Sequence, residues 1–518
     1  LGTTAAGTTV VDGAALEIQG GISIGAEALT LNGSGISGGG ALRNISGDNS
    51  ISGNITLGSA AQINSDANTL TLSGTITNAG NTLTVGGAGN TALNGAISGL
   101  GGLTKDGAGT ATLGAANLYS GATTVNAGKL TVTGSIASSV ITVNNAATLE
   151  VDGAAIADTA AITLNDTSTL NLTGSETIGS LTGAAGSSVA LGANTLTTGG
   201  DNTSTTYEGV ISETGSLIKE GTGTFTLTGA NSFSGAVDVK GGTLAITGSG
   251  SLAATDLETA ATATLSTDGS ALGSTVSITN AGDFALTGGG DESIAAINGS
   301  GDITLSNGSV LTLNTGASVI GGVISGNGGL TIAGTSATTL NGANTYVGGT
   351  TVNAGSLTLG ANNVLWDDGD VTLNGGMIST NFTDTIDTLT QTAGTLTGTG
   401  TLTADGGFVQ SGGTTGGTIT INTTTFDQSG GATIALGTTV SASGDQTLAS
   451  GTIAGNLSGA GAVTVQTGTT ALTGAITAAT TVVSGTLTVT AGTITGAAEN
   501  DGGTITVVGG TFTGGLTN

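Results

Sequence analysis

The sequence has 518 residues, of which 99 are Gly, 2% are aromatic and 7% are charged, and it contains no Pro, Cys or His. Without Cys there are no disulfides, thiolate nucleophiles or Cys-based metal sites, and without His there is no Ser-His-acid triad. The net charge of -28 argues against a nucleic-acid partner, because a phosphate backbone would be repelled.

The chain begins with LGTTAAGTTVVDG, which has no basic segment followed by a long apolar one, so we expect a mature or excised piece. No run of about 18 apolar residues predicts a transmembrane helix. Short runs then alternate apolar and polar residues, as in TLTLSGTIT at 69–77 and GKLTVTG at 128–134. This period of two predicts an ordered all-β chain and not a disordered Gly-rich one.

A long motif occurs three times, near 95–132, 209–246 and 322–359, and successive copies are shifted by nearly the same length of chain. A degenerate fourth copy is predicted near 459–489. Each of the first three copies has an Asn, an aromatic residue and a Gly at the same offsets: Asn117, Tyr119 and Gly121; Asn231, Phe233 and Gly235; Asn344, Tyr346 and Gly348.

The Asn and aromatic residues of this motif have a structural and a binding interpretation. Asn tolerates a left-handed backbone and hydrogen-bonds its neighbours, so we predict that it forms tight corners and is not a ligand contact. Phe replaces Tyr in one copy, so the hydroxyl is dispensable. We therefore predict that the ring packs beneath a loop and does not stack on a sugar.

The densest acidic cluster lies in LWDDGDV, with Asp367, Asp368 and Asp370 beside the only Trp, Trp366. Close oxygen ligands suit Ca²⁺, but Asp-Asp-Gly-Asp is also a turn sequence. The spacings of an EF-hand and of the glycine-rich calcium repeat are absent, so we predict a turn and expect no cofactor, with Ca²⁺ as the one candidate.

Catalytic constellations are not evident elsewhere in the sequence. Hydrolases and lyases built on stacked strands need clustered carboxylates and a base, often Arg or Lys. Arg43 is the only Arg, and its context LRNISGDNS suggests no partner group. The sequence therefore predicts a protein that is not an enzyme.

A shorter period follows in the last third of the chain. Gln391, Gln410 and Gln428 recur at nearly equal steps, and Gln446 and Gln466 continue the series. A stacked amide ladder on successive turns of about 19 residues would explain this series. Six such turns match the shift between copies of the long motif, so we expect those copies to lie on the same side of the molecule.

A turn of this length has room for three short strands joined by tight turns. The predicted fold is thus an all-β, right-handed parallel β-helix with a triangular cross-section, continuous over residues 1–518. Leu, Val, Ile and Ala should face inward, and Thr, Ser and Asn outward, as in the alternating run Thr395, Thr397, Thr399. About 27 turns would extend roughly 130 Å. Thr-x-Thr pairs do not keep the step of one turn over positions 1–360, so an ice-binding face is not predicted.

The segment GGLTKDGAGTATLGAANLYSGATTVNAGKLTV at 101–132 and its two later copies resemble the passenger-associated transport repeat of Gram-negative autotransporter passenger domains. This resemblance implies a right-handed β-helix that is exported through an outer-membrane barrel and then displayed or released. Many relatives are adhesins. The final GGTFTGGLTN lacks the amphipathic strands of such a barrel, so we expect any anchor to lie outside this chain.

We therefore expect a non-enzymatic stalk or adhesin on the bacterial surface or in the medium, with host or neighbouring-cell surface molecules as partners. The alternative is a self-assembling subunit of an extracellular filament, sheath or surface layer. Open ends of a stacked-strand protein expose unpaired strand edges, which favour end-to-end association.

Overall fold

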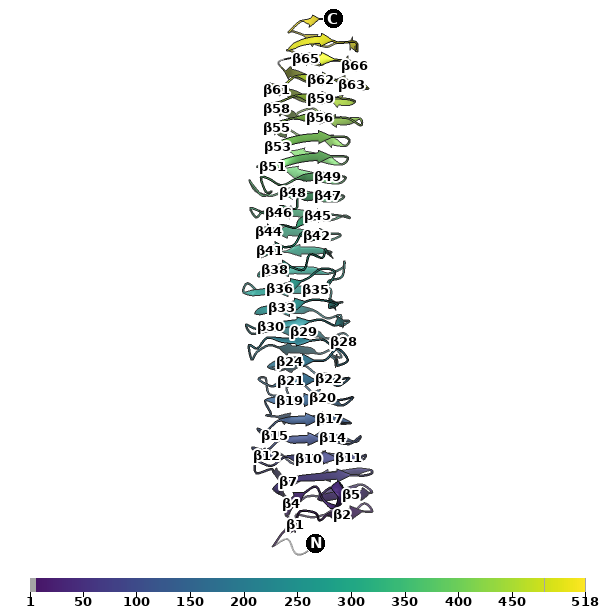
Figure 1. The fold of residues 1–518 in the computed structure, drawn as a ribbon, viewed down its shortest axis with the longest axis vertical. Helices are drawn as coiled ribbons and strands as arrows, with labels where there is room; N and C mark the ends of the chain where they lie inside the picture. The colour runs from purple at the N-terminus through teal and green to yellow at the C-terminus, as the bar shows by residue number, and fades with distance from the viewer. Residues whose placement is uncertain (1–5, 479, 518) are drawn as a thin grey trace. The chain divides into compact units, whose positions relative to one another are not determined.

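The computed structural model describes residues 6–478 and 480–517. They form short strands stacked on one another (Figure 1), and these strands pair in parallel with strands one turn earlier and one turn later. The chain divides into two compact units, residues 1–265 and 266–518. The predicted all-β parallel solenoid is confirmed; in the described ranges the helical structure is the short 3₁₀ turn η1 (Ile36–Gly38). Residues 1–5, 479 and 518 of the predicted β-helix lie outside the described residues. Residue 479 is also part of the predicted fourth copy of the motif. The continuity of the two units stays a prediction.

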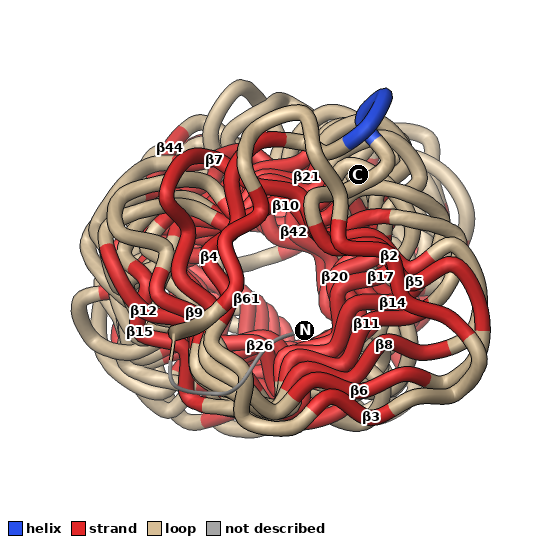
Figure 2. The backbone as a smooth tube through the Cα atoms, turned by 90° about the horizontal axis from the view of Figure 1, so that it is seen from below, coloured by secondary structure: helices blue, strands red, loops and turns tan. Residues whose placement is uncertain are grey.

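One turn of the first unit consists of β13 (Leu103–Lys105), β14 (Thr110–Leu113) and β15 (Ala116–Tyr119), after which β16 (Thr123–Val125) pairs with β13. This turn therefore has three strands, as predicted. Viewed along the stack, β14 lies in one layer with β11 (Asn90–Leu93), β17 (Lys129–Val132) and β20 (Thr148–Asp152) (Figure 2).

Side chains alternate between the core and the solvent along this layer. The inward ladder is apolar and buried, whereas the neighbouring outward ladder is mostly polar. Burying a Leu or Val side chain contributes roughly 1.5–3 kcal/mol, so these ladders form the core. The inward ladder is Leu72, Leu93, Leu113, Val132, Val151 and Leu172, and the outward one is Thr71, Ala92, Thr112, Thr131, Glu150 and Asn171.

Turn length varies along the chain around the predicted period. Ser23 pairs with Ser50 across a long early turn, whereas Gln446 pairs with Val463 across a short late one. The long early turn includes η1, and the short late turns are joined by tight Gly corners. Turn length is thus set mainly by the corner loops, because most of the strands are short.

The expectation that the copies of the long motif lie on the same side is wrong in the first unit. Six successive pairings lead from β13 to β30 (Thr224–Leu227). This strand contains Leu227, whose counterpart in the first copy is Leu113 of β14 and not Leu103 of β13. The second copy is therefore displaced by one face, because turns in this stretch are longer than the predicted period, as the wide step from Gly183 to its partner Tyr207 illustrates.

The glutamines of the second unit form a short ladder. Gln391 pairs with Gln410 and Gln410 with Gln428, all three are buried, and each Nε2 donates to the previous Oε1, at 3.1 and 3.3 Å. The extension of the ladder to Gln446 and Gln466 is wrong. Gln446 pairs with Phe426, two positions out of register, and Gln466 is exposed.

Replacing Gln410 with Glu is expected to destabilise the second unit. A carboxylate cannot donate to Gln391 Oε1, and its charge would be buried, so we expect the free energy of unfolding to fall by about 1–3 kcal/mol. The control is Gln466→Glu at the exposed position. Guanidinium denaturation measures both, and equal midpoints would contradict a role for the ladder.

Candidate functional site

The three Asn residues of the long motif are buried bridges between turns. Asn117 Oδ1 accepts the Ile97 N–H at 2.9 Å, and its Nδ2 donates to the carbonyls of Ala115 and Ser135, at 2.7 and 3.0 Å. Asn231 and Asn344 make the corresponding bonds to both neighbouring turns. None has a positive φ, so the left-handed interpretation is wrong, and their exposure of 0–3% leaves no surface for a ligand.

The aromatic residues of the motif are also buried, and the residue four positions later suits the polarity of each ring. The Tyr119 hydroxyl hydrogen-bonds Thr123 Oγ1 at 2.8 Å, and Tyr346 bonds Thr350 in the same way. Phe233, which has no hydroxyl, has Val237 at the position of these threonines. Burial raises the pKa of Tyr346 to about 12. These rings therefore fill the interior and present no platform for a sugar.

The motif glycines lie at corners where two turns touch. A Cβ at Gly121 would come within 3.0 Å of the backbone of Gly101, and the same holds for Gly235 against Gly215 and Gly348 against Gly328. Only Gly fits such a close approach of two backbones. The motif thus describes how successive turns fit together.

Two buried lysines belong to the motif and were missed by the sequence analysis. Lys105 Nζ donates to the carbonyls of Asp106, Gly107 and Ala127, at 2.7, 2.8 and 3.1 Å. Lys219 does the same at the corresponding corner, while Ile332 stands there in the third copy. Burial lowers the pKa of Lys105 to about 8. The available signal was that two of the few basic residues in the chain recur at the same offset of the motif.

Three buried carboxylates were also missed. Glu176, Glu292 and Asp384 each accept backbone N–H bonds from two consecutive residues of the preceding turn, at 2.9–3.4 Å. All three are at most 2% exposed, and burial raises the pKa of each. The sequence signal is an acid followed by Ser or Thr and then Ile, as in ETI, ESI and DTI.

The acidic cluster of the second unit is not gathered into a site. Asp367, Asp368 and Asp370 are exposed on a turn closed by the Gly369 N–H bond to the Trp366 carbonyl at 2.9 Å. The Thr388 hydroxyl donates to Asp370. Within residues 6–478 and 480–517, no three acidic side chains lie close enough together to hold a metal ion.

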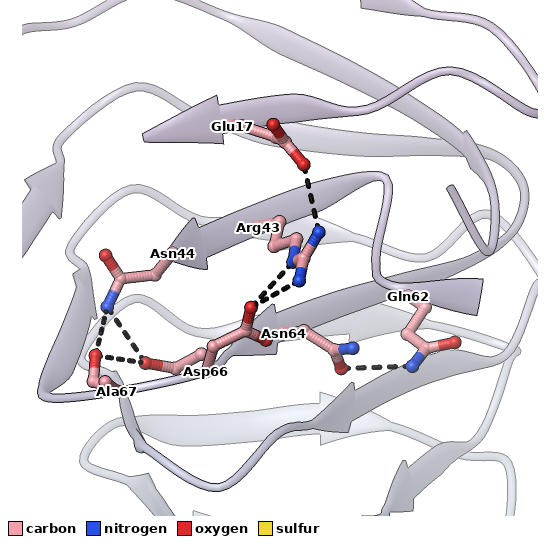
Figure 3. Close-up of polar contacts among 8 residues, drawn as sticks. Glu17, Arg43, Asn44, Gln62, Asn64, Asp66 and Ala67 are labelled. Carbon is pink, nitrogen blue, oxygen red and sulfur yellow. Dashed lines mark hydrogen bonds and ion pairs between the residues drawn. The ribbon is translucent and has the colours of Figure 1, made fainter. Parts of the chain in front are cut away.

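Arg43 does have partners, contrary to the sequence interpretation. Its guanidinium contacts Asp66 Oδ2 at 2.6 and 2.7 Å and Glu17 Oε1 at 3.1 Å, and these residues belong to the turns on either side (Figure 3). Glu17 is directly opposite Arg43 in the strand pairing. These ion pairs link three successive turns. Because both carboxylates are bound to the same guanidinium, this cluster provides no free base.

The family model described as passenger-associated-transport-repeat matches residues 103–132, 217–246 and 326–359, which together are less than a fifth of the chain. The predicted copy near 459–489 is not among these ranges. No curated protein and no solved structure matches the chain. Among the described residues there is no helix that is long and apolar enough to cross a membrane.

Replacing Phe233 with Tyr is expected to lower the free energy of unfolding by about 1–3 kcal/mol, because the new hydroxyl would be buried against Val237 without a partner. Adding Val237→Thr restores the pair found at Tyr119 and Thr123, so we expect the double variant to regain most of the loss. Chemical denaturation of both single variants and the double variant measures the coupling. Additive losses would show that the pair is not coupled.

Asp384 is expected to make the second unit more stable as the pH falls from about 6 to about 4. Burial, helped by the nearby Asp367, raises its pKa from 3.8 to about 6, so in this window the folded state binds a proton that the unfolded state has released. Asp384→Asn keeps an acceptor for the Val364 and Leu365 N–H groups and removes the titration. Compared with this variant, the wild type should gain up to about 3 kcal/mol between pH 7 and pH 4. A difference that does not change with pH would contradict this assignment.

Proposed function

We propose, on the premise that three passenger-associated-transport-repeats on a parallel β-solenoid mark an autotransporter passenger, that this chain is a non-enzymatic stalk that presents an adhesive surface outside the cell. The observation that carries the proposal is the combination of these repeats with turns tied by internal hydrogen bonds. Such repeats imply translocation to the cell surface or release. The partners are then surface molecules of host or neighbouring cells.

The chemistry of the outward residues supports a binding role and not a catalytic one. Thr, Ser and Asn dominate the outward ladders, and these side chains form hydrogen bonds but do not supply a general base at neutral pH. The three buried carboxylates and two buried lysines that have perturbed pKa values are bonded to backbone groups inside the stack. They have no access to a substrate.

Adhesion is testable with fluorescent beads that carry the purified chain. We expect these beads to be retained on epithelial cells or on bacteria above the level of albumin-coated beads, with saturation by free protein. Failure of retention on every cell type tried would count against the adhesive role. Analytical ultracentrifugation should give a mass independent of concentration, whereas growth of the mass with concentration would support the filament subunit instead.

A further inference from the structure

A groove of about 450 Å³ crosses four successive turns of the second unit. It is formed by β53 (Thr401–Gln410), β55 (Thr420–Thr423), β58 (Thr439–Ala442) and β61 (Asn456–Gly459), which pair in register and carry neighbouring labels in Figure 1. Gly459 and Ala460, on the last of these turns, line the groove without a polar side chain. Its volume lies within the range of about 300–1,000 Å³ typical of ligand sites.

The side chains along the groove have unused hydrogen-bonding capacity. Thr403, Asn422 and Ser441 are directly opposite one another on successive turns, and Asp405 and Ser443 line the groove beside them. In the described part of the chain, none of these five side chains makes a hydrogen bond, whereas the hydroxyl of the neighbouring Thr424 donates to the Asp405 carbonyl at 2.8 Å. The backbone between these turns is paired, so the free groups are hydroxyls, one amide and one carboxylate.

This lining excludes most classes of partner. A peptide strand needs unpaired backbone groups, and a phosphate needs basic side chains; the groove lining offers neither. A lipid needs large apolar side chains, and the only apolar side chains in the lining are those of Ala442 and Ala460. An acidic polymer would be repelled by a chain of net charge -28. A neutral polyhydroxylated ligand fits, because its hydroxyls both donate to and accept from the groups present.

We propose that this groove binds a neutral polysaccharide laid along the stacking direction. This inference rests on the proposed adhesive function and names its ligand class. Successive turns repeat the hydroxyl and amide groups about every 4.8 Å, so consecutive sugar rings meet equivalent partners. The groove has no aromatic platform, so each ring is held weakly, and affinity comes from the several turns acting together.

Affinity electrophoresis in native gels tests the proposal, with dextran, mannan, laminarin and galactomannan as the probes. The wild-type protein should be retarded by at least one of them. Asn422→Ala should weaken that binding by about three- to tenfold, the effect of one lost hydrogen bond. Ser441→Arg should abolish it, because the long side chain obstructs the groove. The matched control is Ser379→Arg in β50 (Met377–Thr380), an outward, half-buried serine on another sheet that should leave retardation unchanged.

Circular dichroism confirms that each variant is folded before it is scored. Absence of retardation by all four polysaccharides would overturn the proposal, as would equal retardation of wild type and Ser441→Arg. Loss of retardation in EDTA would assign the groove to a cation at Asp405. Thermal hysteresis in ice without polysaccharide binding would assign this surface to ordered water. In each of these cases, beads that are still retained on cells would show that the adhesive role stands and only the groove assignment fails.

Discussion

The structure depends on the hydrogen bonds that join each turn to the turns before and after it. Within strands the backbone supplies these bonds, but the ladder ends at every corner, where carbonyl and N–H groups still need partners. Side chains take over there. Lys105 donates to corner carbonyls of two turns, Gln391 Nε2 bonds the carbonyls of Gly394 and Thr414, and Asn117 bonds the turns on both sides. Long or bifunctional polar side chains thus complete a ladder that the backbone cannot complete alone.

The same need explains the buried carboxylates. Asn344 Nδ2 donates to the Val364 carbonyl, and Asp384, one turn farther on, accepts the Val364 N–H at 2.9 Å. Both backbone groups of Val364 are therefore bonded by side chains from the turns on either side. An Asn can do both jobs, whereas an acid can only accept when it is ionised. The ionised carboxylate carries a desolvation cost, and that cost makes this part of the second unit sensitive to pH.

Much of the fold could be predicted because, in a stacked-strand protein, similar residues recur in the sequence at a spacing of one turn. Gln391 and Gln410 lie one period apart since they occupy the same position on adjacent turns. The face of the solenoid on which each motif copy lies could not be predicted, because corner loops change length without changing the strands. A few extra residues over six turns displace Leu227 by one face. The partners of Arg43 were missed for a related reason. Glu17 and Asp66 are 26 and 23 residues away from Arg43 in the sequence. These separations are longer than the predicted turn, so the predicted period does not place either carboxylate beside Arg43.

Because the first two copies of the motif lie on different faces of the first unit, their shared residues cannot form one repeated binding surface. Asn117, Tyr119 and Lys105 are buried, and each interacts with its own and the adjacent turns. Outward residues do not make these contacts between turns. Thr403, Asn422 and Ser441 can be replaced without altering the inward ladder of Leu402, Ile421 and Val440. Recognition can therefore be placed on any few consecutive turns at little cost to stability. In such a protein the ligand site is to be sought where free outward polar groups coincide on neighbouring turns, and not in the long motif, whose residues are buried.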